Sequence, residues 1–329
     1  MYTNQDLNRA VEENIFSQES VENFRLYIAQ EKSTQSVDEE NFKLVSGFND
    51  IFVVIASLLL LISSWWIASA VHPLLSPLVV ALLSWGLSEF FVRKRKMSFP
   101  AIILLLTFVW SIFILFSGSL ILASAMAGVS TYFHWKRFAV PITIAIGMGV
   151  VTTFIVALLV KIFPNLEAYI AFPIFLMGIG VFIVAMYWDI KDKKRVTNDS
   201  DVAFWLHLLA SPLIIHSIFL GLNIFDNNIG IDAMFDILAS YVLLSAISLI
   251  IDRRALMVSS LLYVLYALNT IFHTYGFQDY SLAIGGTIIG FGLLVLTAFW
   301  TDVRAILVGF LPLFIQNRVP LTIKKSKNG

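Results

Sequence analysis

The stretch PAIILLLTFVWSIFILFSGSLILASAMAGVSTYFHW, residues 100–135, decides the fold of this chain. It is apolar almost throughout, and its length barely accommodates two membrane crossings, because a transmembrane helix needs about 20 residues. Its only turn signal is Ser117-Gly118-Ser119, near the middle. The choice between one helix and two in this stretch sets the side of the membrane on which every later loop lies.

The positive charges favour two helices, because Lys and Arg are enriched in the cytoplasmic loops of membrane proteins. With two crossings here and a cytoplasmic N-terminus, only Lys161 of the 22 Lys and Arg lies near the outer face, whereas a single crossing would place every later basic loop outside. The outer loops are then neutral to acidic. The sequence therefore predicts ten spans: residues 51–70, 74–92, 100–117, 119–135, 139–162, 170–188, 202–222, 234–251, 255–272 and 281–300.

Composition places the chain among integral membrane proteins. Hydrophobic residues make up 58% and charged residues 13% of the 329 residues, against about 45–50% and 25% in soluble domains. The formal net charge is zero, so no nucleic-acid partner is expected. Cysteine is absent, which excludes disulfides and thiolate chemistry. No cofactor or metal site is predicted, and the lipid bilayer is the partner that the composition indicates.

Three parts follow one another along the chain. Residues 1–46 are predicted to form a cytoplasmic amphipathic helical hairpin and linker, in which Ser17 caps the second helix. Residues 47–304 are predicted to form an all-α transmembrane bundle with both chain ends in the cytoplasm. Residues 305–329 combine an apolar stretch, too short to cross and expected along the membrane interface, with a basic tail.

A weak repeat marks the predicted cytoplasmic ends of the helices. Five times, an aromatic-rich end carries an acidic residue or His shortly before Lys or Arg. The pairs are Glu89 with Arg93, His134 with Lys136, Asp189 with Lys191, Asp252 with Arg253, and Asp302 with Arg304. The repetition favours tandem helical hairpins. The charged groups themselves are interpreted as orientation anchors that pair locally at the interface.

The seventh span carries the most informative polar groups. Asp201 lies at its start, and His207 and His216 lie about 9 Å and 22 Å farther along, within the hydrocarbon layer. Ionisable side chains at such depth are costly and are candidate functional groups. A spacing of nine residues places the two histidines on opposite faces of a straight helix, with Pro212 between them. They are interpreted either as a proton- or ligand-responsive element or as two separate interhelical hydrogen bonds, and Asp201 as a helix cap.

Other candidate residues are scattered along the chain. Glu89, near the end of the second span, has an arginine four residues on, in the orientation of a local ion pair. Asn269 and His273 belong to a polar stripe toward the outer end of the ninth span. Gly286 and Gly290 form a GxxxG pattern in the tenth span that predicts close helix packing. The same packing is expected of Gly147, Gly149, Gly178 and Gly180 in the fifth and sixth spans.

Several short patterns resemble a known family. Leu7 to Phe24, with Ile15-Phe16-Ser17-Gln18-Glu19 at the hairpin turn, precedes a polytopic apolar body, and the stretches 40–50 and 199–207 add to the same layout. In these features the chain resembles the bacterial predicted membrane proteins of the 2157 family of domains of unknown function. The resemblance implies a bacterial inner-membrane location. It carries over no catalytic or binding residue, because that family has no assigned activity.

Three functions remain open at this stage. Ten spans with few buried polar groups match the size of small-solute transporters or permeases, although the two five-span halves show no clear mutual similarity. A membrane scaffold or envelope-sensing protein would dock a cytoplasmic protein partner through the N-terminal hairpin. An intramembrane enzyme acting on lipid would draw on the ionisable residues expected in the cytoplasmic leaflet, Glu89, Asp189, Asp201, His207 and Asp252. No P-loop, dinucleotide fingerprint, HExxH or Ser-His-Asp signature is present. The sequence does not indicate an oligomeric state.

Overall fold

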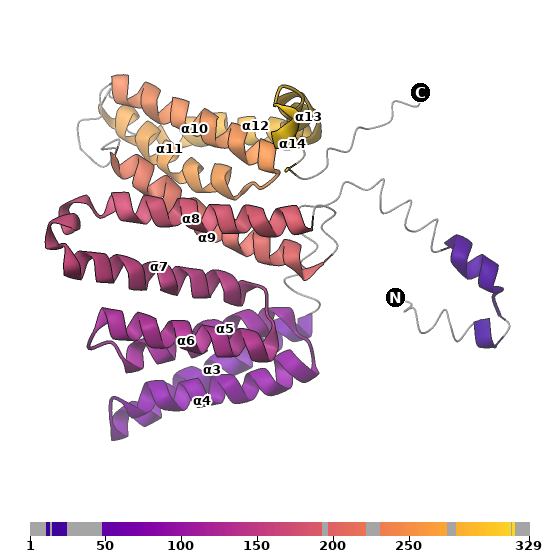
Figure 1. Ribbon diagram of the computed structural model, residues 1–329, viewed down its shortest axis with the longest axis vertical. Coiled ribbons are helices and arrows are strands. Elements are labelled where there is room, and N and C mark those ends of the chain that lie inside the picture. Colours follow the sequence, from indigo (N-terminus) through magenta and orange to yellow (C-terminus); the bar gives the residue numbers. More distant parts are fainter. Residues whose placement is uncertain are drawn as a thin grey trace.

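The structure is a computed structural model that describes residues 11–13, 15–24, 48–192, 197–221, 231–274, 281–316 and 318–319. Within these ranges the chain forms helices and turns, with no strand. Long helices run side by side, alternate in direction along the chain and stack into an elongated bundle (Figure 1). The all-α class predicted from the sequence is confirmed.

Each predicted apolar segment corresponds to one long helix, with boundaries shifted by a few residues. The helices are α3 (Phe48–Val71), α4 (Leu75–Ser88) continued by the π-helical turn η1 (Glu89–Lys94), α5 (Ser98–Leu115), α6 (Leu120–Phe138), α7 (Ile142–Ile162), α8 (Ala171–Lys191), α9 (Asn198–Gly221), α10 (Ile231–Ile251), α11 (Ala255–Thr274) and α12 (Ser281–Ala298). A 3-10 turn, η2 (Pro164–Tyr169), precedes α8, and the short helices α13 (Trp300–Gly309) and α14 (Leu313–Gln316) follow α12.

Six of these helices are each long and apolar enough to cross a bilayer: α3, α4 with η1, α5, α7, α8 and α9. The apolar stretches described in α10 and α11 are shorter, and α12 qualifies only together with α13, from which it is bent by 73°. Large apolar side chains such as Trp66, Ile67 and Leu294 are about 70% exposed, as expected of a surface that faces lipid. These are the features of a membrane-embedded helical protein.

Residues 100–135 fold as two helices. α5 ends at Leu115 and α6 begins at Leu120, and the backbone N–H of Ser117 donates to the carbonyl of Ile114 between them. Ser119 has an extended backbone, and its hydroxyl accepts a hydrogen bond from the N–H of Leu122 at 3.4 Å, which caps α6. The turn predicted at Ser117-Gly118-Ser119 is therefore confirmed.

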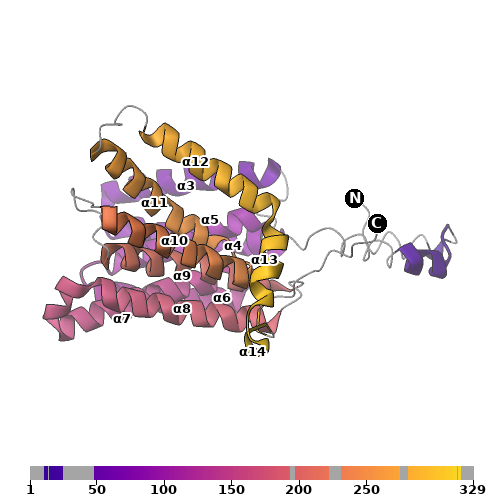
Figure 2. The same ribbon diagram turned by 90° about the horizontal axis from the view of Figure 1, so that it is seen from above.

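Several hairpins close with the same backbone conformation. Lys96, Ala139 and Asp252 follow η1, α6 and α10 and have φ angles of 54°, 50° and 57°. A left-handed residue just after a helix ends it and reverses the chain. The ends of η1, α6, α8 and α10 and the start of α3 consequently lie at one end of the bundle, across which α13 also runs (Figures 1 and 2). We call this the basic end, because within the described helices and their turns every Lys and Arg except Lys161 lies there.

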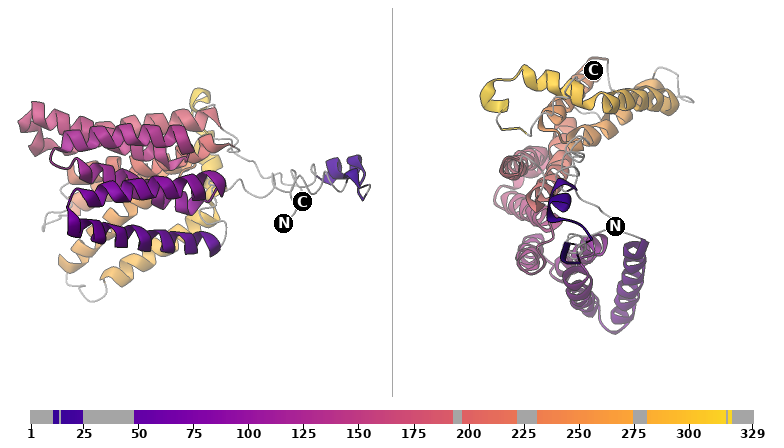
Figure 3. Two further views of the ribbon diagram at one scale, coloured as in Figure 1. Left: turned by 90° about the horizontal axis from the view of Figure 1, so that it is seen from below. Right: turned by 90° about the vertical axis from the view of Figure 1, so that its right-hand side faces the viewer.

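The core is a series of clusters between neighbouring helices rather than one central core. One cluster, around Leu104 and Leu105 of α5, joins the five helices α3, α4, α5, α6 and α7. Another, around Val181 and Leu206, joins α7, α8 and α9. Further clusters join α9 to α11, and α10 to α12 and α13. Seen along the helices, the bundle extends from α3 and α4 at one extreme to α12 at the other (Figure 3).

The N-terminal hairpin is described only in part. The backbone N–H of Ser20 donates to the hydroxyl of Ser17 at 3.1 Å, and residues 18–24 are helical, so Ser17 caps this helix as predicted. Most of the first helix predicted for the hairpin, and the linker to α3, lie outside the described residues.

Candidate functional site: a buried ionic cluster at the basic end

The site depends on the close packing of α8 against α9, the most extensive helix contact in the described bundle. Gly178 of α8 lies so near α9 that a Cβ there would be 2.9 Å from the Ile214 side chain and 3.0 Å from its backbone nitrogen. Ala185 on α8 and Ala210 on α9 are fully buried in the same contact. Small residues let two helix backbones approach closely, so the packing predicted for Gly178 is confirmed.

Three ionisable side chains meet where α8 and α9 reach the basic end. The Asp189 carboxylate of α8 lies 2.7 Å from Nε2 of His207 on α9 and 2.6 Å from Nη2 of Arg253 in the α10–α11 turn. All three side chains are 2% exposed or less. Two helices and one turn, separated by up to 64 residues in the chain, are thereby joined through one carboxylate.

The geometry fixes how the protons are arranged. A carboxylate only accepts hydrogen bonds, so Nε2 of His207 carries the proton in its contact with Asp189. Arg253 donates from Nη2 to the other carboxylate oxygen and also to the backbone carbonyl of Ser200, at 3.3 Å. The Asp189 carboxylate is thus held by two donors at opposite oxygens, as an ionised group at a buried position requires.

The α10–α11 turn directs Arg253 into the bundle. Asp252 has a left-handed backbone, which Asp tolerates better than most residues, and it turns the chain sharply after Ile251. The N–H of Arg253 donates to the carbonyl of Ser248 at 3.0 Å, and the Ser248 hydroxyl donates to the carbonyl of Arg253. Both backbone hydrogen bonds to Ser248 therefore hold Arg253 in the position from which its guanidinium contacts Asp189.

Two more carboxylates surround the cluster. Asp192 accepts hydrogen bonds from the backbone N–H and the hydroxyl of Thr197, at 2.8 and 2.7 Å, and so closes the connection from α8 to α9. Asp201, half-buried in the first turn of α9, lies within electrostatic reach of both Arg253 and Asp192. Asp189 thus contacts one guanidinium and one imidazole, and Asp201 and Asp192 add two further carboxylates beside the cluster.

Of the residues predicted from the sequence, His207 and Asp201 belong to this cluster. The predicted helix cap is a different residue, because the Thr197 hydroxyl accepts the N–H of Asp199 at the start of α9. Glu89 lies elsewhere at the basic end, where it accepts hydrogen bonds from Arg137 at 2.6 and 3.1 Å and from Arg93 at 3.3 Å. The convergence of Glu89 with the other carboxylates, which a lipid-acting enzyme would use, is therefore not present.

His216 faces the opposite side of α9 from His207. Its Nδ1 lies 2.8 Å from the hydroxyl of Tyr263 on α11, and the Tyr263 ring stacks on Phe219 at a centroid distance of 4.9 Å. The histidines thus contact different helices, in agreement with the half turn predicted from their spacing. Asn269 is half-buried on α11. The side chain of His273, in the last turn of α11, lies outside the described residues.

The packing role predicted for Gly286 and Gly290 is not seen among the described residues. A Cβ built at either glycine of α12 would meet no described atom within 4 Å. A GxxxG pattern permits close approach but does not specify which helix, if any, takes it up. The close approaches in this bundle occur instead at Gly178 and, less tightly, at Gly147, where a Cβ would lie 3.3 Å from Thr131.

The repeated charges make contacts between hairpins that the predicted local pairing did not include. Glu89 forms such a local pair with Arg93 at 3.3 Å, but its shorter contact, 2.6 Å, is to Arg137 of the next hairpin. The acidic group of one hairpin end binds an arginine of a later one in three cases: Glu89 with Arg137, Asp189 with Arg253, and Asp252 with Arg304. The sequence indicates Arg253 as an anchor, and Asp189 as an anchor or as an ionisable group of a lipid-acting enzyme, but it does not pair the two.

No family model, curated protein or solved structure matches this chain. Within the described residues no group of three or more His, Asp or Glu side chains is arranged to hold a metal ion. The interpretation of the cluster therefore rests on its own geometry.

Proposed function

We propose that the chain crosses the membrane ten times, with the basic end and both termini in the cytoplasm, as a bacterial inner-membrane protein. The positive charges support this orientation, because cytoplasmic loops attract Lys and Arg and the basic end holds nearly all those described. The bend between α12 and α13, which lays α13 across the basic end, supports an interfacial position for the residues after the tenth span (Figure 2). Membership of the 2157 family of domains of unknown function is part of the same proposal.

We propose further that the protein is a proton-coupled transporter or permease for a small solute. One observation carries this: Asp189 of α8, His207 of α9 and Arg253 of the α10–α11 turn are almost fully buried and converge on one carboxylate. Ionisable side chains inside a membrane protein are costly, and in transporters they commonly bind or relay protons. The cluster holds three carboxylates against one guanidinium, so an added proton reduces its net charge.

The coupling follows from the role of Asp189 as a shared acceptor. While ionised, it holds both His207 of α9 and Arg253 of the α10–α11 turn. A proton placed on the carboxylate removes the charge that binds Arg253, which frees α10 and α11 to move relative to α8 and α9. His216 and Tyr263, farther along α9 and α11, bridge these two helices and would line a solute path that opened between them.

Proton-coupled solute uptake tests this function. The protein is reconstituted in vesicles that enclose a pH-sensitive dye, and a panel of amino acids, sugars and nucleosides is added in turn. At least one solute is expected to move protons with it in the wild type. Asp189→Asn, which retains the shape and a hydrogen-bond acceptor, is expected to lose that coupling.

Glu89→Gln is the matched control, because Glu89 also lies at the basic end but in a pair that is 31–43% exposed. It is expected to couple normally. Equal coupling in Asp189→Asn and the wild type, in vesicles with equal amounts of folded protein, would show that the cluster binds no transported proton.

A second function, a membrane scaffold, is favoured by a separate observation. Ion pairs join the ends of successive hairpins, an arrangement that suits a rigid platform. In this case residues 1–46 would dock a cytoplasmic protein. The full chain, but not one lacking residues 1–46, should then recover the same partner from cell membranes, and the cluster substitutions should leave that recovery unchanged.

A further inference from the structure

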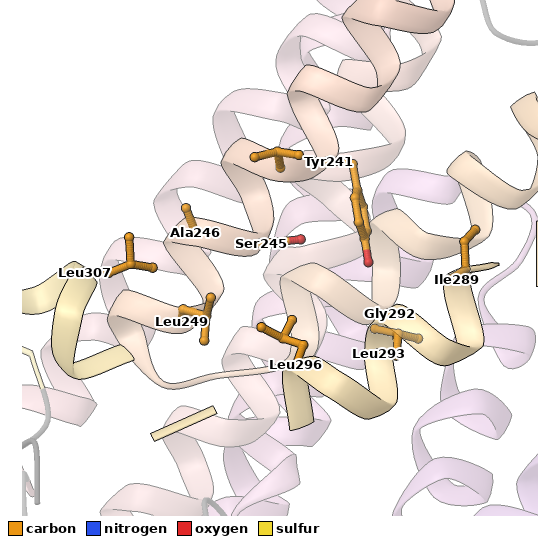
Figure 4. Close-up of a pocket in the computed structure, with 10 residues that line it drawn as sticks. Tyr241, Ser245, Ala246, Leu249, Ile289, Gly292, Leu293, Leu296 and Leu307 are labelled. Atoms are coloured by element: carbon orange, nitrogen blue, oxygen red, sulfur yellow. The ribbon is translucent and has the colours of Figure 1, made fainter. Parts of the chain in front are cut away.

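An apolar groove of about 460 Å³ lies between α10, α12 and α13 (Figure 4). Its lining includes Tyr241, Ser245, Leu249, Gly292, Leu296 and Leu307. Val242 on its rim is 65% exposed, and a Cβ at Gly292 would meet no atom within 4 Å, so the groove opens to the outside of the bundle. This surface belongs to neither the ionic cluster nor the His216 region.

The groove lies within one leaflet. Tyr241 and Leu249, which mark its extent along α10, are eight residues apart, or about 12 Å of helix. That is less than half of the hydrocarbon thickness of about 30 Å. Its Leu249 end is two residues before the end of α10, and therefore next to the basic end.

A cation lies directly beyond that end of the groove. Leu249, Leu296 and Leu307 pack in one cluster with Trp300, and the guanidinium of Arg254 lies over the Trp300 ring at 4.9 Å. Trp300 is fixed in place because its indole N–H donates to the Asp252 carboxylate at 2.8 Å. Arg254 is exposed. The exposed guanidinium of Arg254 thus lies over an indole ring that packs against one end of the apolar groove.

The local charge around Arg254 is positive. The Asp252 carboxylate lies 3.6 Å from Nε of the buried Arg304, and together Asp252, Arg304 and Arg254 carry one net positive formal charge. Asp302 is exposed on α13, but it follows Trp300 by two residues, and that step turns about 200° around a helix. Its carboxylate therefore lies on the far side of α13 from the indole.

We propose that this groove binds one acyl chain of an anionic phospholipid, with the lipid phosphate at Arg254. An apolar channel that opens sideways in a membrane-embedded helix bundle suits a hydrocarbon chain, and a guanidinium binds phosphate through paired donors. Trp300 lies between the two parts of the ligand, at the depth that indole prefers. The site needs only a membrane-embedded chain and is independent of proton coupling.

The test measures which lipids remain bound to the full-length protein. It is reconstituted in nanodiscs with equal phosphatidylglycerol and phosphatidylcholine and extracted into mild detergent, and bound lipid is quantified by mass spectrometry. Wild type is expected to retain about one phosphatidylglycerol per chain and little phosphatidylcholine. Arg254→Gln should retain about fivefold less, the loss expected for one basic side chain at a lipid surface.

Gly292→Leu tests the groove without touching the charge, since the new side chain enters open space. It should lower retention as well. Arg95→Gln and Gly180→Leu are the controls: Arg95 is an exposed arginine over Phe90 at the basic end, and Gly180 also faces open space but lies on α8. Both should retain lipid like the wild type. Equal loss in Arg254→Gln and Arg95→Gln, unchanged retention in Gly292→Leu, or equal retention of the two lipids would overturn the site.

Discussion

Removal of the Arg253 guanidinium should be among the most destabilising single changes in this protein. In Arg253→Met the Asp189 carboxylate keeps only the His207 imidazole at 2.7 Å and loses its charged partner at 2.6 Å. Both side chains of the lost pair are 2% exposed or less, so water does not replace the guanidinium. Breaking a buried ion pair from one side costs about 3–5 kcal/mol, because a charge is left without compensation.

Thermal unfolding of the purified protein in detergent measures this effect. A loss of that size corresponds to a decrease in Tm on the order of 10 °C. Arg95→Met, which removes an exposed arginine from the turn after η1, serves as the matched control and should change Tm little. The double variant Asp189→Asn/Arg253→Met leaves no unpaired charge and should recover more than half of the loss. An Arg253→Met protein as stable as Arg95→Met, or a double variant no better than Arg253→Met, would refute the cluster as described.

Three further outcomes follow from individual contacts. Gly178→Leu should destabilise by about 1–3 kcal/mol, because its side chain would overlap Ile214, whereas Gly180→Leu should be nearly neutral; equal unfolding curves for the two would contradict the packing of α8 on α9. Glu89→Gln should lower Tm far less than Arg253→Met, because the ion pairs of Glu89 are partly exposed and screened by water. A comparable decrease in Tm would mean that these ion pairs are buried in the membrane. His216→Phe should lower the free energy of unfolding by only about 0.6 kcal/mol, the value of one interhelical hydrogen bond. In transport assays the same variant should change solute affinity. A large fall in Tm would show that the contact with Tyr263 is chiefly structural.

The helices were predictable from the sequence because their apolar runs are long and their turns are marked by charge. The division of residues 100–135 is the clearest case, since the Ser117-Gly118-Ser119 signal and the distribution of Lys and Arg both required two helices, and α5 and α6 are separate. The opposite orientations of His207 and His216 followed from helical periodicity alone.

The ionic cluster was only half predictable. His207 and Asp201 stood out as polar groups in an apolar segment, but Asp189 and Arg253 lie at helix ends, where charged residues are ordinary. Their pairing depends on how α8 packs against α9 and on the left-handed turn at Asp252, neither of which periodicity encodes. The GxxxG of α12 shows the same limit, because glycine spacing describes one surface and says nothing about its neighbour, and no described atom lies within 4 Å of a Cβ built there.

The side of the membrane on which the turns lie is the central claim, and single-cysteine labelling tests it most directly. The chain contains no cysteine, so each introduced thiol is the only one present. Arg95→Cys and Lys136→Cys mark the basic end, and Ser117→Cys and Asn165→Cys mark the opposite end; all four positions are exposed. With a membrane-impermeant maleimide on intact cells, the account predicts labelling at Ser117 and Asn165 only, and labelling at Arg95 and Lys136 only after permeabilisation. Labelling of Arg95 or Lys136 in intact cells, or protection of Ser117 together with accessibility of Asn165, would contradict it.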